Sequence, residues 1–97
     1  MSDANEVRSS FMPQIAEEKL AAFDEAMRLV RIEFTQAIMA HPPYHSAHEG
    51  ISVMKEELEE LWEHVRADTG GTKDAKGEAV QVASTAMRYI VEICAHG

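Results

Sequence analysis

Two groups of acidic and amide side chains are spaced so that they could bind a divalent cation. The first is the run 56–60, and the second begins at Glu78 and includes Gln81. Residues three or four apart share a face of an α-helix, so Glu57 with Glu60 and Glu78 with Gln81 each place two oxygen-bearing groups side by side. Carboxylates held together repel each other unless a cation such as Mg²⁺ lies between them. The two pairs therefore predict a cation site if their helices pack antiparallel.

The same acids also fit a plainer interpretation, in which they only solvate a helix surface. A glutamate-rich amphipathic helix usually presents its acids to water, and Glu59 and Glu63 are expected to point that way. An acid near a helix start, such as Glu78, is stabilised by the helix dipole without any ligand. Glu57 differs, because it borders the predicted apolar face, where an unpaired carboxylate is costly. Its position weakens the interpretation of the cluster as a merely solvated surface.

Three predicted helices position these residues, which makes the fold class all-α. They cover residues 14–40, 46–67 and 73–95. The consecutive prolines Pro42 and Pro43 end the first helix, because proline lacks a backbone donor and disfavours helix in the residue before it. Ser46 and Glu49 have the spacing of a capping box at the start of the second. Turn-forming residues in the linker 68–72 separate the second helix from the third.

The apolar faces of these helices predict self-association. Residues 14–97 form one small domain behind a flexible N-terminal arm at 1–13. Three helices in one short chain cannot easily bury every apolar stripe, so we expect a homodimer with a four-helix-bundle core, which can pair again into a tetramer. The apolar positions that most require cover are Leu20, Phe23, Met27, Val30, Phe34 and Ile38, then Ile51, Met54, Leu58, Leu61, Trp62 and Val65, then Val82, Met87, Ile90 and Ile93.

Composition restricts the partners and the compartment. The chain has 97 residues, and 17 acidic against 9 basic side chains give a net charge of −8, which opposes binding to a phosphate backbone. We therefore expect no nucleic-acid partner. No signal-peptide pattern or apolar run of membrane-spanning length occurs, so a cytoplasmic protein without membrane contact is expected. The single cysteine, Cys94, excludes an intrachain disulfide, and its apolar helical pattern predicts a buried thiol.

The histidines offer a second metal hypothesis. His41, His45 and His48 lie close in sequence, but they lack the thiolate partners and regular spacing of a structural zinc site. Histidines in a helix-joining loop without a metal are the favoured interpretation. His64 lies four residues after Glu60 on the same side of the helix, where it could hydrogen-bond a carboxylate or a bound water. An ordinary histidine at the edge of the core is the favoured interpretation.

The acidic pattern resembles that of the MazG-like all-α nucleoside triphosphate pyrophosphohydrolases, in particular a small single-domain branch. The family motif Glu-Glu-x-x-Glu is met by Glu56, Glu57 and Glu60, and its second half, Glu-x-x-Asp on the next helix, aligns with Glu78 and position 81. The stretch from Ser46 to Trp62, and residues 78–83, are also similar. The resemblance covers roughly residues 15–95.

The resemblance implies a Mg²⁺-dependent hydrolysis of the α–β phosphoanhydride of a nucleoside triphosphate, which releases a monophosphate and pyrophosphate. Such enzymes remove unwanted nucleotides from the cellular pool. Carried over residue by residue, Glu57, Glu60, Glu78 and Gln81 occupy the metal-ligand positions. Glu56 and Glu57 are the catalytic candidates, with Glu56 either a further ligand or the residue that orients water. Three lysines could meet the phosphates: Lys55, Lys73 and Lys76.

Gln81 departs from the family pattern, which has aspartate there. A carboxamide offers one oxygen without a charge, so Mg²⁺ binding should be weaker. Two functions stay open. One is an enzyme in which Glu56 or substrate phosphates complete the metal shell, and the other is a helical-bundle interaction or regulatory module without activity. The sequence does not indicate which base or sugar is preferred.

Overall fold

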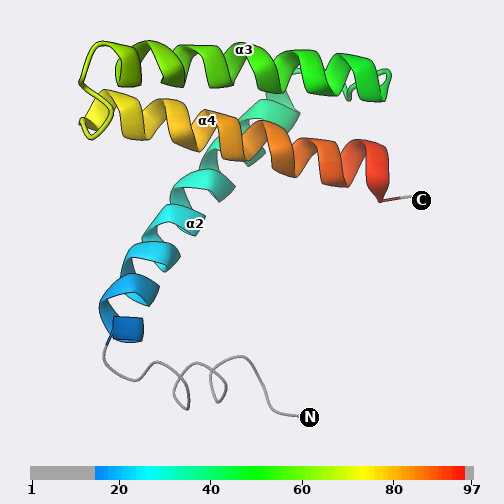
Figure 1. Ribbon diagram of the computed structural model, residues 1–97. Helices are drawn as coiled ribbons and strands as arrows, with labels where there is room; N and C mark the ends of the chain where they lie inside the picture. Colours follow the sequence, from blue (N-terminus) through cyan, green and yellow to red (C-terminus); the bar gives the residue numbers. More distant parts are fainter. Residues whose placement is uncertain (1–14, 96–97) are drawn as a thin grey trace.

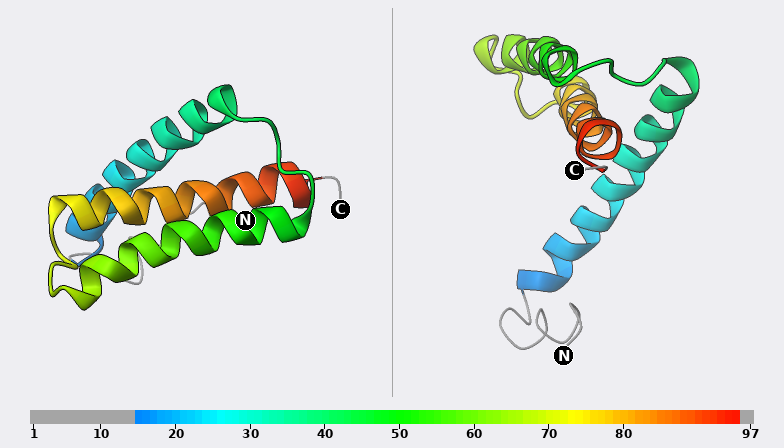
Figure 2. Two further views of the ribbon diagram at one scale, coloured as in Figure 1. Left: turned by 90° about the horizontal axis from the view of Figure 1, so that it is seen from above. Right: turned by 90° about the vertical axis from the view of Figure 1, so that its right-hand side faces the viewer.

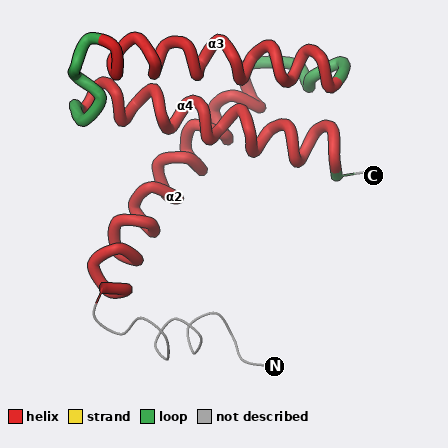
Figure 3. The backbone as a smooth tube through the Cα atoms, viewed as in Figure 1, coloured by secondary structure: helices red, strands yellow, loops and turns green. Residues whose placement is uncertain are grey.

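The computed structural model describes residues 15–95, and within them the fold is entirely helical (Figures 1 and 3). The helices are α2 (Ile15–Ala40), α3 (Ala47–Arg66) and α4 (Lys73–Tyr89), and α4 continues into a π-helical turn, η1 (Ile90–Cys94). This confirms the all-α class and the three predicted helices. The predicted arm at 1–13 lies outside the described residues. Within residues 15–95, no helix is long and apolar enough to cross a membrane.

The loop between α2 and α3 starts and ends as the sequence indicates, with one difference in the cap. The helix α2 ends at Ala40, just before His41 and the two prolines. The Ser46 hydroxyl accepts a hydrogen bond from the Glu49 N–H at 3.1 Å, as expected of an N-cap. The Glu49 carboxylate, however, accepts from the His45 N–H at 3.2 Å. The Glu49 carboxylate therefore binds the backbone of His45, the residue before the N-cap, and not the N–H of Ser46 that a reciprocal capping box would use.

The connection between α3 and α4 depends on an aspartate and a threonine. Asp68 has a φ of 60°, a left-handed conformation that Asp tolerates better than most residues. Neither linker glycine, Gly70 or Gly71, has a positive φ. The Thr72 hydroxyl then caps α4 by accepting from the Ala75 N–H at 3.2 Å. This short turn makes α3 and α4 an antiparallel pair.

The central helix is α4, which packs against both α3 and α2. In both views of Figure 2, α3 and α4 lie side by side and α2 crosses them obliquely, and the right view shows the N-terminal half of α2 standing clear of the other two helices. The Cα radius of gyration is 16.0 Å, whereas a compact domain of this length has about 12 to 13 Å. The described chain is therefore an open arrangement with one projecting helix.

Little of the apolar surface is buried within a single chain. The buried residues include Val30, Tyr44 and Ala75, together with three polar residues of α4: Ser84, Thr85 and Arg88. Trp62 and Leu58 on α3 are 54% and 53% exposed, and Phe23 on α2 is 49% exposed. The predicted apolar stripes thus exist, but much of their surface faces outward.

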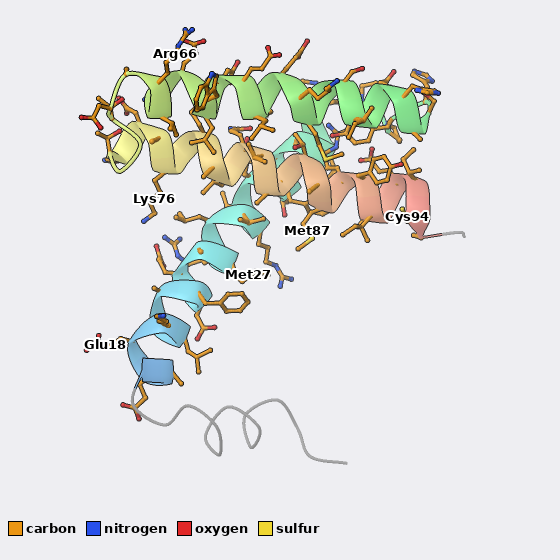
Figure 4. The ribbon with its side chains drawn as sticks, viewed as in Figure 1. Glu18, Met27, Arg66, Lys76, Met87 and Cys94 are labelled. Carbon is orange, nitrogen blue, oxygen red and sulfur yellow. The ribbon has the colours of Figure 1, made fainter. Side chains whose placement is uncertain are left out.

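The prediction of a buried Cys94 thiol is wrong, because this cysteine is exposed. It lies in η1, at the end of the long α4–η1 helix, and is labelled in Figure 4. Tyr44 and the α2–α3 loop pack against Arg88 and Glu92 of this helix, but Cys94 itself stays exposed.

Gly50 allows α3 to approach α4 and the loop closely. It is buried, and a Cβ at this position would lie 2.7 Å from Cδ2 of Tyr89 and 3.1 Å from Cδ2 of Tyr44. Such distances are shorter than carbon atoms tolerate, so a larger residue would push the two aromatic rings aside. The glycine therefore sets the separation of the helices at the end of the pair near the loop.

Candidate functional site

The antiparallel packing of α3 and α4 brings acids from the two predicted clusters together. One carboxylate oxygen from each of Glu57, Glu60 and Glu78 lies within 4.8 Å of the other two. Glu57 and Glu60 are on one face of α3, and Glu78 is near the start of α4. Among residues 15–95 this is the only group of three or more His, Cys, Asp or Glu side chains close enough to hold one metal ion. The converging pairs expected from the sequence are therefore present for these three acids.

The surroundings of the cluster oppose ionisation. The pKa of Glu57 is raised to about 7, mainly by burial. The charge and hydrogen bond of Glu60 contribute next, followed by the charges of Glu78 and Glu56. The pKa of Glu78 is also raised, first by burial and then by Glu60, while His64 acts in the opposite direction. Glu60 contacts both other acids and is exposed. Among the described residues, the mutual repulsion of these acids and their burial therefore outweigh the opposing effect of His64.

Three other acids of α3, Glu56, Glu59 and Glu63, lie near the cluster in sequence but are not part of it. Glu56 is exposed, and its charge contributes to the raised pKa of Glu57. Glu59 is also exposed. Glu63 forms an exposed ion pair with Arg66, one turn along the same helix, and Figure 4 shows Arg66 on the outer side of α3. The expectation that Glu59 and Glu63 face solvent is confirmed.

Gln81 forms a hydrogen bond to a residue that sequence analysis did not identify. Its Nε2 donates to Oε1 of Glu33 on α2 at 2.8 Å, and both side chains are half-buried. Gln81 also lines a hollow shared with Glu78 and His64. A metal-ligand role at position 81 stays a prediction, since the amide group is engaged with α2. The sequence did not single out Glu33, which lies on another helix, 48 residues before Gln81 in the chain.

The three lysines occupy different surroundings, and all three are exposed. Lys73 lines the same hollow as Glu78, one of the three clustered acids. Lys76 faces α2, where its charge helps to lower the pKa of Glu25 after the stronger effect of Arg28. Lys55 lies on the exposed surface of α3. Their substrate-binding roles stay predictions.

A buried ion pair anchors the loop between α2 and α3. Arg88 on α4 binds Glu92 through Nε at 3.0 Å and Nη2 at 3.2 Å, and its Nη2 also donates to the carbonyl of Pro42 at 3.1 Å. Glu92 accepts from the Tyr44 N–H at 2.8 Å, and the Arg88 guanidinium lies 4.2 Å from the centre of the Tyr44 ring. Sequence analysis missed this network. The spacing of Arg88 and Glu92, four residues apart on an apolar helix, was the only signal for it.

A cavity of about 520 Å³ lies between this loop and the three helices. Its walls include Glu57 of the acidic cluster, the Glu33–Gln81 pair, and Arg88 with Tyr44 from the anchored loop. One of the predicted acids, Glu57, therefore borders a space of a size that small-molecule sites have. His41, His45 and His48 are exposed and form no metal-binding group with other described residues.

No protein-family model matches this chain, and no curated protein or solved structure is significantly similar to it.

Proposed function

We propose that this chain is a Mg²⁺-dependent nucleoside triphosphate pyrophosphohydrolase that releases a nucleoside monophosphate and pyrophosphate. One observation carries the proposal: Glu57, Glu60 and Glu78, from two different helices, converge within 4.8 Å beside a cavity of about 520 Å³. The resemblance of the acidic motif to the MazG-like enzymes supplies the reaction. The family assignment itself is part of the proposal.

The chemistry of the cluster fits a hard divalent cation. Mg²⁺ prefers oxygen ligands and usually binds through a few carboxylates together with substrate phosphates and waters. Burial and mutual repulsion raise the pKa of Glu57 and Glu78, so a cation would relieve an electrostatic cost already present in the protein. Glu57, Glu60 and Glu78 would hold it. When bound, Mg²⁺ neutralises phosphate charge and lowers the pKa of a coordinated water.

The other residues divide between water activation and phosphate binding. Glu56 is exposed next to the cluster, so it can orient an attacking water or accept its proton while the other three acids act as ligands. Lys73, in the hollow beside Glu78, is the best-placed lysine for a phosphate oxygen. A positively charged side chain such as Lys73 would help to bind the substrate, because a chain with a net charge of −8 repels a triphosphate.

The experiment is a panel of nucleoside triphosphates incubated with and without Mg²⁺, in which pyrophosphate and orthophosphate are measured separately. The proposal requires Mg²⁺-dependent release of pyrophosphate, and Glu57→Gln and Glu60→Gln should each reduce kcat/KM by about 100-fold or more. Glu59→Gln is the matched control, because it removes one charge from the exposed side of the same helix. Release of orthophosphate, or equal losses in all three variants, would contradict the assignment.

We further propose that the chain acts as a homodimer with a four-helix-bundle core, able to pair into a tetramer. The support is the exposed apolar surface of Phe23, Leu58 and Trp62 and the projection of α2 away from the other helices. An isolated helix of this kind gains little stability without tertiary packing. Light scattering at micromolar concentration should give a dimer or tetramer. A helical monomer at the same concentration would exclude this assembly.

The alternative is an interaction or regulatory module that uses the same helices without catalysis. The observation that favours it is the bond between Gln81 and Glu33, which engages position 81 away from the three acids. The nucleotide panel separates the two functions. A module would form the oligomer but release no pyrophosphate with any triphosphate.

A further inference from the structure

The cavity beside the acidic cluster has polar walls, and most of the donors that Arg88, Tyr44 and Thr85 contribute to them are bound within the protein. The Arg88 guanidinium donates to Glu92 and to the Pro42 carbonyl. The Tyr44 hydroxyl donates to the carbonyl of Thr85 at 3.4 Å, and the Thr85 hydroxyl donates to a carbonyl one turn earlier at 2.7 Å. These contacts fix the shape of the wall. They engage both hydroxyls and three of the five guanidinium N–H groups, while the two on Nη1 have no hydrogen-bond partner among residues 15–95.

At the wall formed by α2 and α4, the Glu33–Gln81 pair presents acceptors instead. A carboxylate only accepts hydrogen bonds, so the amide of Gln81 must direct its NH₂ group at Glu33. The Gln81 carbonyl oxygen and the second Glu33 oxygen are then left as acceptors. Neither has a hydrogen-bond partner among residues 15–95. The other wall residues with free N–H groups, Gln36 and His41, are exposed to water.

We infer that the cavity holds the base of the nucleotide and that Glu33 and Gln81 select a base with an exocyclic amino group over its carbonyl analogue. The inference rests on the proposed function. An amino group donates two hydrogens, which suits a wall where one hydrogen-bonded pair of side chains offers two free acceptor oxygens, whereas a carbonyl oxygen at the same place would face them unpaired. Glu57 belongs to both the cavity wall and the acidic cluster, so a base in the cavity places its phosphates on the side of the acids.

The enzymatic test uses pairs of substrates that exchange an amino group for a carbonyl group: dCTP with dUTP, and ATP with ITP. In the wild type with Mg²⁺, the amino member of a hydrolysed pair should have a kcat/KM at least about tenfold higher. Glu33→Gln replaces an acceptor by a group that also donates, so the ratio should fall to within about threefold. The control Glu59→Gln makes the same charge change outside the cavity and should keep the wild-type ratio. Equal rates for both members in the wild type, or an unchanged ratio in Glu33→Gln, would overturn the inference.

A binding test separates failure of this inference from failure of the proposed function. Cytidine, uridine, adenosine and inosine are titrated without metal into ¹⁵N-labelled protein, and the side-chain amide signals of Gln81, assigned with Gln81→Glu, are followed by NMR. Cytidine or adenosine should shift these signals at concentrations at which uridine and inosine do not. If no triphosphate is hydrolysed, the proposed function fails while this result still decides base selection. No shift with any nucleoside, or equal shifts with all four, would refute the selection.

Discussion

Ionisation of Glu57 should make the metal-free protein less stable as the pH rises. The carboxyl group is half-buried, and burial together with Glu60, Glu78 and Glu56 raises its pKa from 4.5 to about 7. In the unfolded chain these causes are absent and the pKa returns to its ordinary value. The variant Glu57→Gln keeps the size of the side chain and removes the titration.

The size and sign of the effect follow from proton linkage. Below pH 4.5 the group is protonated in both states and costs nothing. Between pH 4.5 and about 7 the unfolded chain releases the proton while the folded protein retains it, so the free energy of unfolding falls. Above pH 7 the full cost is present, about 3 kcal/mol, because each pH unit between the two pKa values corresponds to about 1.4 kcal/mol. Most of it, about 2 to 3 kcal/mol, develops between pH 5 and pH 8.

The assay is urea denaturation at pH 5 and pH 8, at one fixed protein concentration and without divalent cations. Relative to Glu57→Gln, the wild type should lose about 2 to 3 kcal/mol on going to pH 8. The control Glu59→Gln, on the exposed side of α3, should behave as the wild type does. Adding Mg²⁺ at pH 8 should restore stability in the wild type but not in Glu57→Gln. The same pH dependence in the wild type and Glu57→Gln would refute the electrostatic reasoning, and a wild type insensitive to Mg²⁺ would refute the metal site.

Two further predictions concern Gly50 and Glu92, which both lie against Tyr44 of the α2–α3 loop. Gly50→Ala should destabilise the protein by about 1 to 2 kcal/mol, because the strain of a Cβ 2.7 Å from the Tyr89 ring exceeds the gain in helix propensity. The control is Gly77→Ala, where a Cβ would meet no atom within 4 Å. This variant should be more stable than the wild type by about 0.5 to 1 kcal/mol in thermal melts. A melting temperature raised equally by both would show that the helices adjust freely. Burial raises the pKa of Glu92, but hydrogen bonds and charge from Arg88 and a backbone N–H outweigh it and hold the pKa below its ordinary value. The contribution of the Glu92 carboxylate to stability should therefore be present above pH 4.5 and disappear at lower pH. At pH 7, Glu92→Gln should lower the free energy of unfolding by about 3 kcal/mol in urea denaturation, because the buried Arg88 loses its charged partner. A loss below about 1 kcal/mol would indicate that water replaces the acid.

The sequence was sufficient for features that depend on neighbours along one helix. Uninterrupted periodicity predicted α2, and Pro42 and Pro43 predicted its end, because the missing backbone donors act locally. The Ser46 cap also followed from residue type. The side-by-side placement of Glu57 and Glu60 required only helical geometry.

What the sequence could not decide depends on how elements meet. The antiparallel turn at Asp68 brings Glu78 to the acids of α3, and no local rule fixes a non-glycine residue in the left-handed conformation there. The same limit applied to Cys94, whose exposure depends on where the neighbouring helices end.

Helical spacing alone therefore determined which faces of this chain carry acids and which carry apolar residues. Tertiary structure alone decided that Gln81 bonds to Glu33 of α2 and that Arg88 and Glu92 fasten the loop at Tyr44. The physical reason is the range of the interactions. Capping and periodicity act over a few residues, whereas the contacts of Gln81 with Glu33 and of Glu92 with Tyr44 each join positions 48 residues apart. Only the packing of α2 and the following loop against α4 brings these positions within hydrogen-bond distance.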